Sequence, residues 1–186
     1  DHWDDIARQA IRKDIPFFVQ HEKDAQAIRS TGFSDVRILD ENTGFAGITL
    51  IKTSGQHGRP KVLEDMKALL GEVSGVVFKH PDEKTFYIAG DTVWCQAVED
   101  NLKKYHPDIV VLNSCDAQVI GNESIIMGKQ DIYEVYKAAP EATVIASHME
   151  AVNHATLTRK ELRGFLSEKG MTQRVLVPED GESYTF

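Results

Sequence analysis

The sequence predicts an α/β domain. Short apolar runs that are typical of buried strands alternate with longer segments that have apolar residues at helical spacing. The two kinds of segment follow one another along the chain, and no repeat, low-complexity tract or linker separates them. At 186 residues the chain fits one domain, 1–186, and can bury a sizeable core.

The first half of the chain is predicted to contain three helices and five strands. The helices are expected at 4–13, 22–30 and 61–71, and Thr31 and Gly32 end the second of them. The strands are expected at 16–19, 35–39, 45–53, 75–79 and 85–89, because these segments are apolar or alternate. The last two strands should form a hairpin around the turn 80–83.

The second half has a regular order of helix and strand. A helix at 95–105 should stop before Pro107. A capping box, Thr158 with Glu161, should open a helix that ends near residues 169–170. The other segments are a strand at 109–112, a helix at 130–139, a strand at 143–146, and strands at 174–177 and 183–186 around the turn 179–182.

Composition narrows the function. The formal net charge of −8 argues against non-specific binding of nucleic acid, which needs a basic face. A small anionic substrate stays possible, because a bound dication inverts the local field. The two cysteines form no Cys-x-x-Cys pair, so we expect them to be reduced, in a cytoplasmic protein. No apolar run approaches the ~20 residues that a membrane helix needs.

Five residues have the chemistry of a metal site. Asp1 and His2 open the chain, His57 lies in Ser-Gly-Gln-His-Gly, Asp91 in Ala-Gly-Asp-Thr, and His148 in Ala-Ser-His-Met. The last three each follow a predicted strand, which is a rigid mount for a ligand. Imidazole and carboxylate groups suit zinc, and manganese or iron are alternatives. Taken singly, each residue is more typical of a turn, a helix cap or a hydrogen-bonded structural position.

The order of these motifs resembles the metallo-β-lactamase superfamily, and most closely its UlaG-like branch of general metal-dependent hydrolases. The first family motif is His-x-His-x-Asp-His, of which Asp1 and His2 match the end. His57, Asp91 and His148 match the later motifs one by one. The resemblance implies an αββα sandwich of two sheets flanked by helices, with the site at one edge.

The resemblance also assigns roles. It implies one or two divalent ions, zinc being the expected metal. His57 would bind the first ion, Asp1, His2 and His148 the second, and Asp91 would bridge both, with Asp1 and Asp91 as the catalytic carboxylates. The leading His-x-His of the motif is absent from the sequence. We therefore expect a preceding N-terminal segment of roughly 50 residues or more, within ordinary domain size, which carries it together with several strands.

Two further residues are candidates with open alternatives. His154 either contacts substrate or lies on the surface near the start of the 158–169 helix. Asp116 either orients a ligand histidine from behind or caps its own loop. Trp3 could wall the pocket, although a core position is favoured.

The predicted function is hydrolysis of a small-molecule ester, lactone or related labile bond by a metal-held hydroxide. No Gly-x-Ser-x-Gly motif suggests a serine nucleophile. Three alternatives stay open: a phosphodiesterase or nuclease on the same fold, a non-catalytic relative poor in metal, and a diiron oxidoreductase. We expect a small-molecule substrate as partner, with no nucleic acid and no membrane.

Overall fold

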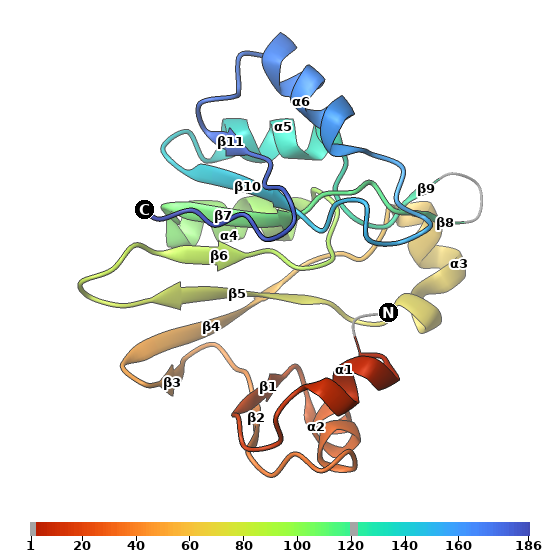
Figure 1. Cartoon of the computed structure of the whole chain (residues 1–186), viewed down its shortest axis with the longest axis vertical. Coiled ribbons are helices and arrows are strands. Elements are labelled where there is room, and N and C mark those ends of the chain that lie inside the picture. The colour runs from red at the N-terminus through yellow and green to blue at the C-terminus, as the bar shows by residue number, and fades with distance from the viewer. Residues whose placement is uncertain (1–2, 120–122) are drawn as a thin grey trace.

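The computed structural model describes residues 3–119 and 123–186, which form a mixed α/β fold around a seven-stranded sheet (Figure 1). In spatial order the strands are β11 (Val175–Leu176), β10 (Thr143–Ser147), β7 (Ile109–Asn113), β6 (Phe86–Ile88), β5 (Ser74–Lys79), β4 (Ile48–Ser54) and β3 (Thr43–Phe45). The four strands from β11 to β6 are parallel, and the pairs from β6 to β3 are antiparallel.

A small unit precedes the sheet in the chain. It comprises α1 (Asp5–Ala10), β1 (Phe17–Val19), α2 (Glu22–Arg29) and β2 (Val36–Ile38), and β1 pairs with β2 in parallel. Figure 1 places it beyond the β3 edge of the sheet. Trp3 belongs to its separate core, with ring centroids 5.1 Å from Phe17 and 5.7 Å from Phe33.

The remaining helices follow the order that the sequence predicts. They are α3 (Pro60–Leu70), α4 (Gln96–Tyr105), α5 (Lys129–Ala138) and α6 (Arg159–Glu168). Between α4 and α5 lies a short antiparallel pair, β8 (Gln118–Val119) and β9 (Glu123–Ser124). The capping box of α6 is confirmed, because the Thr158 side chain accepts from Glu161 N and the Glu161 carboxylate accepts from Thr158 N.

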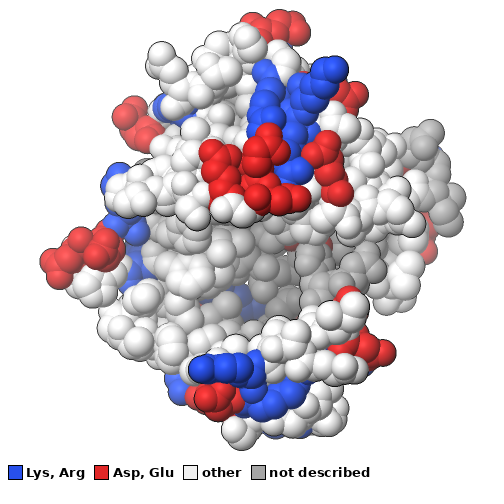
Figure 2. All heavy atoms as spheres, in the orientation of Figure 1, with Lys and Arg blue, Asp and Glu red and all other residues white. Residues whose placement is uncertain are grey.

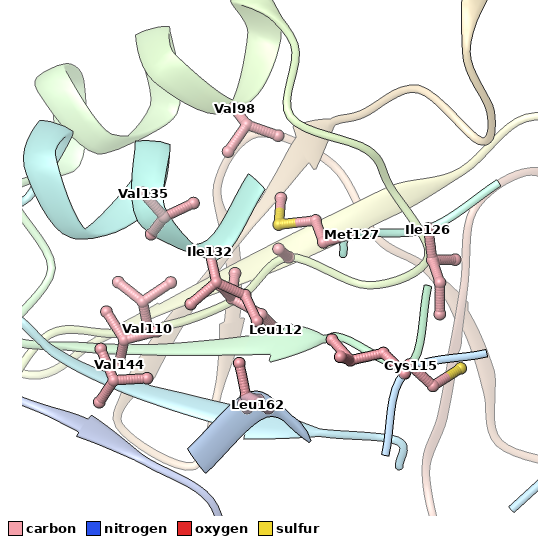
Figure 3. Packing of buried hydrophobic residues seen from close by; sticks show 14 of the residues in the cluster. Val98, Val110, Leu112, Cys115, Ile126, Met127, Ile132, Val135, Val144 and Leu162 are labelled. Atoms are coloured by element: carbon pink, nitrogen blue, oxygen red, sulfur yellow. The ribbon is translucent and has the colours of Figure 1, made fainter. Parts of the chain in front are cut away.

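The main core lies on one face of the sheet. Val77, Tyr87, Val110 and Val144 follow one another across strands β5, β6, β7 and β10, and all four are fully buried. Because residues in register share a face, they form a continuous apolar surface. Helices α4 and α5 cover it with Val98, Ile132 and Val135 (Figure 3).

The other face of the sheet is also apolar. Val76, Ile88, Val111 and Ile145 lie in register across the same four strands, and each is half-buried. A sheet that is apolar on both faces is typical of folds in which both faces are covered. Within the described ranges, the sheets other than the seven-stranded one have two strands each.

The predicted elements are largely confirmed, with two kinds of difference. The short strands β3, β8 and β9 were not predicted, because two or three residues carry too little pattern. The strand predicted at 183–186 is wrong. The turn before it forms, with Glu182 N bonded to Glu179 O, but the residues after it are exposed and outside the sheet. An alternating pattern cannot form a strand without a neighbouring strand to pair with.

Charged side chains gather over α6 and the end of the chain (Figure 2). The Arg159 guanidinium donates to the Glu150 carboxylate at 2.6 Å, to the Pro178 carbonyl at 2.9 Å and to Asp180. This arginine therefore joins the loop after β10 to the segment after β11.

Within the described part of the chain, no helix is both long and apolar enough to cross a membrane.

Candidate functional site

The topology brings four strand ends to one edge of the sheet. Strand β4 is antiparallel to β5, which is antiparallel to β6, so β4 runs in the direction of β6, β7 and β10. Their carboxyl ends therefore lie at the same edge. His57 follows β4, Asp91 follows β6 and His148 follows β10 directly.

A cavity of 990 Å³ opens at this edge. His57, Asp91, His148 and His154 all line it, together with Asn113 at the end of β7. Residues far apart in the sequence thus contribute to one pocket. Asp116 is not among the lining residues, although Ala117 and Gln118 are. Asp1 and His2 lie outside the described residues.

The His57 ring is oriented by the end of α3. Its Nδ1 atom lies 3.2 Å from the carbonyl oxygen of Leu70. Because a carbonyl can only accept, this hydrogen bond requires the proton on Nδ1 and leaves the lone pair on Nε2. Such a bond to the second nitrogen is typical of histidines that bind metals. Gly58 allows the sharp turn that follows, with a φ of +121°.

Asp91 is positioned by its neighbours on two sides. Gly90 before it has a φ of +74°, and a Cβ atom at that position would lie 2.9 Å from the Ser74 carbonyl oxygen. Only glycine fits this approach of β6 to the start of β5. Asn113 Nδ2 donates to Asp91 Oδ1 at 2.6 Å. The carboxylate is therefore held from β7 as well as from its own strand.

Thr92 ties the Asp91 loop to the His57 loop. Its fully buried hydroxyl accepts from Gln56 N at 2.8 Å and donates to Val93 O at 2.9 Å. The backbone adds a third bond, from Val93 N to Gln56 O at 2.9 Å. The loops that carry the two candidate ligands thus form one hydrogen-bonded unit.

His148 has an unusual backbone for its residue type. Its φ is 59°, in the left-handed region that non-glycine residues rarely adopt, and such residues gather at functional sites. Its Nδ1 atom lies 3.6 Å from Sγ of Cys115. Burial raises the pKa of the Cys115 thiol, with Asp91 and Asp116 adding to the rise, so a neutral thiol lies against the ring.

The two secondary candidates have different surroundings. His154 lines the cavity, with Nδ1 3.3 Å from the Asn153 side-chain oxygen. The Asp116 carboxylate accepts from Ser124 Oγ at 2.5 Å and from Gln118 Nε2 at 3.3 Å. These contacts join its own loop to β9, which fits the loop-capping alternative for Asp116.

The donor set suits a divalent metal in chemistry but is incomplete within the described residues. The His57 ring presents Nε2, and Asp91 and His148 add a carboxylate and a second imidazole to the same cavity. Within 3–119 and 123–186, however, no three His, Cys, Asp or Glu side chains are grouped closely enough to hold an ion. A full set needs further donors, for which the resemblance described above offers Asp1 and His2.

Sequence reasoning missed Asn113 and Thr92. Thr92 is the last residue of the Ala-Gly-Asp-Thr motif, and Asn113 lies three residues before the candidate Asp116. Their role could not be inferred, because each acts on a residue from another segment.

No family model matches the sequence. The UPF0173 protein YddR of Bacillus subtilis (strain 168) is 53% identical over all 186 residues, which span 72% of its length. The chain belongs to the UPF0173 family. Two solved structures extend the likeness of this UPF0173 chain, and each is matched over 100% of the chain and 72% of its own length.

One is an isothiocyanate hydrolase from Delia radicum gut bacteria, with 47% identity and a TM-score of 0.95. The other is a possible metal-dependent hydrolase from Veillonella parvula DSM 2008, with 44% identity and a TM-score of 0.96. The metallo-β-lactamase fold protein YhfI from Bacillus subtilis shares the fold, with 12% identity, a TM-score of 0.64, and coverage of 95% of this chain and 68% of YhfI. The predicted fold class and the predicted assignment to the metal-dependent hydrolases are confirmed for this UPF0173 chain.

Proposed function

We propose that this UPF0173 protein is a metal-dependent hydrolase that adds water to an electrophilic carbon of a small molecule. One observation carries the proposal: a single cavity receives His57, Asp91 and His148 from three parallel strand ends. Relatives that are 44% and 47% identical over the whole chain are named hydrolases, which supports the same chemistry here.

The chain's own residues would hold and orient the metal site. His57 would bind through Nε2, Asp91 through its carboxylate and His148 through its imidazole, with Asp1 and His2 completing the set. Asn113 and the Leu70 carbonyl restrict Asp91 and His57 to one orientation. When bound, a divalent metal lowers the pKa of water and polarises the bond to be cleaved. Zinc suits these donors best, and manganese or iron fit them as well.

The substrate class that we propose comprises esters, lactones and isothiocyanates. In an ester or lactone, water adds to the acyl carbon, the acyl C–O bond breaks and the alcohol oxygen takes the proton. In an isothiocyanate, water adds to the central carbon, the C–N bond breaks, and an amine and carbonyl sulfide result. Isothiocyanates are included because a relative of 47% identity is named for their hydrolysis.

The test combines metal analysis with a substrate panel on the full-length protein. Metal content is measured by elemental analysis as purified, after chelation and after reloading. The panel contains a p-nitrophenyl ester, a lactone, phenethyl isothiocyanate and bis(p-nitrophenyl) phosphate. His57→Ala tests the site, and His80→Ala serves as a control because His80 lies in the turn between β5 and β6 and does not line the cavity.

We expect turnover of the ester, the lactone or the isothiocyanate. This activity should be lost on chelation and in His57→Ala, and it should be kept in His80→Ala. Cleavage of the phosphodiester alone would replace the proposal with a phosphodiesterase. A metal-loaded protein that cleaves none of the four substrates would favour a non-catalytic relative.

A further inference from the structure

The cavity has a polar end and an apolar wall. The polar end is formed by the candidate ligands and Asn113. The wall comes from α3 and the residues after it, and we call it the α3 wall: Met66, Leu69, Leu70 and Val73. Because Leu70 lines the cavity and its carbonyl also holds His57, the wall begins directly beside the candidate site.

Away from the candidate metal ligands, the described residues that line the cavity favour a neutral group. Of the described residues that line it, Asp24 and Asp91 are acidic and none is a lysine or an arginine. A phosphate or carboxylate group placed against the α3 wall would lose its hydration without gaining a cationic partner among the described lining residues. Pockets for anionic groups are typically lined by arginine or lysine instead.

Leu69 is the most informative residue of the α3 wall. It is 77% exposed, so its side chain adds little to the stability of the fold. Val62, two turns earlier on the same helix, is buried in the main core. The helix thus anchors one end in the core and presents leucine to water at the cavity. Leu69 lies with Met66, Leu70 and Val73 at one cavity, and a group of apolar side chains beside a pocket is typical of a ligand-binding surface.

A rigid aromatic ring also lines the cavity. Trp3 is held by edge contacts to Phe17 and tilted contacts to Phe33, in the core of the small unit. An aromatic ring fixed in this way offers a flat apolar surface at little conformational cost.

From the α3 wall, the absence of lysine and arginine among the described lining residues, and the exposed Leu69, we propose that the cavity selects neutral substrates with an apolar alkyl or aryl group. That group lies against the α3 wall, and Leu69 determines how much kcat/KM rises as the group becomes longer. This proposal rests on the proposed hydrolase function. It further specifies the chemical class of the substrate's non-reacting group and the residue that recognises that group.

The first experiment measures selectivity in the full-length, metal-loaded protein. The substrates are p-nitrophenyl acetate, butyrate and hexanoate, together with the half ester of adipic acid, which matches the hexanoate in length but ends in a carboxylate. We expect kcat/KM to rise about two- to fourfold per added methylene and to fall at least about tenfold for the acid-ended substrate.

Variants then assign the effect to the α3 wall. Leu69→Ser should flatten the dependence of kcat/KM on chain length, because serine removes the apolar surface that the longer chains would contact. Ile6→Ser is the matched control, since Ile6 is 76% exposed, lies on α1 and does not line the cavity. Equal chain-length slopes in Leu69→Ser and Ile6→Ser would overturn the role of Leu69.

A binding experiment separates this proposal from the proposed function. Octan-1-ol and octanoate are titrated into the metal-free protein, and the methyl signals of Leu69 and Met66 are followed by NMR. We expect saturable shifts with octanol, weaker ones with octanoate, and weaker octanol binding in Leu69→Ser. Octanol binding without any hydrolysis would leave the pocket assignment intact and refute the hydrolase. Hydrolysis without octanol binding, or tighter binding of octanoate, would refute the apolar pocket alone.

Discussion

The buried hydroxyl of Thr92 and the backbone amide of Gln56 form a 2.8 Å hydrogen bond that joins the two loops bearing His57 and Asp91. The two candidate ligands follow strands β4 and β6, which are not adjacent in the sheet because β5 lies between them. The distance between the ligands therefore depends on this bond and on the Val93 to Gln56 backbone bond, as well as on the sheet.

We predict that Thr92→Val will loosen the site more than Thr92→Ser. Valine matches threonine in shape but leaves the buried Gln56 amide without its acceptor, which should cost about 1–3 kcal/mol of unfolding free energy. Serine keeps the hydroxyl and loses only a methyl group. Urea unfolding and metal titration measure the two effects, and equal metal affinity in both variants would contradict the role of the bond.

Asp91→Asn should lower metal content and reduce hydrolysis at least about a hundredfold while the fold persists. The amide removes the negative charge that offsets the bound dications. Asp82→Asn is the control, because Asp82 is exposed in the turn between β5 and β6. Elemental analysis and circular dichroism are the measurements. Unchanged activity in Asp91→Asn would refute its role as a bridging ligand.

His148→Ala should reduce metal affinity, whereas His154→Ala should alter substrate affinity or have no effect. Both histidines line the cavity, but His148 follows β10 directly and His154 lies in the loop beyond it. A ligand on a strand end is held more rigidly than one on a loop. Metal titration and KM values distinguish the two, and the reverse pattern would exchange their assignments.

Arg59→Ala should reduce the unfolding free energy by about 2–4 kcal/mol. Arg59 Nη2 lies 2.8 and 2.7 Å from the two carboxylate oxygens of Asp131, which is 3% exposed and also accepts from Gly128 N. Removal of the guanidinium leaves a buried carboxylate without its cation. Lys137→Ala, which breaks an exposed pair with Glu134, should cost under about 1 kcal/mol and is the control. Similar losses in the two variants would show that the Asp131 carboxylate finds water.

The fold and the placement of the main candidates could be predicted because both depend on local signals. Apolar periodicity locates strands β4, β6 and β10, and the polar residues that follow them must lie where those strands end. Three of these strand ends share an edge because the strands run in the same direction, and the sequence alone does not show strand direction. The common edge was inferred instead from the resemblance of the motif order to the metallo-β-lactamase superfamily.

The contacts that hold the site could not be predicted. Asn113 bonds to Asp91 across 22 positions and Thr92 to Gln56 across 36, and no periodic pattern records such pairings. The error at 183–186 has the same origin. Alternation at Tyr184 and Phe186 is compatible with a strand, but a strand also needs a neighbour, and that depends on the rest of the sheet.

The left-handed backbone of His148 affects which residues selection would favour at this position. With a φ of 59°, the position suits glycine or asparagine better than histidine by about 1 kcal/mol. Glycine would relieve this strain, so we expect His148→Gly to be more heat-resistant while it loses the imidazole that we propose as a metal ligand. We therefore expect a screen for thermal tolerance alone to enrich glycine at position 148, and a screen that also demands activity to keep the histidine.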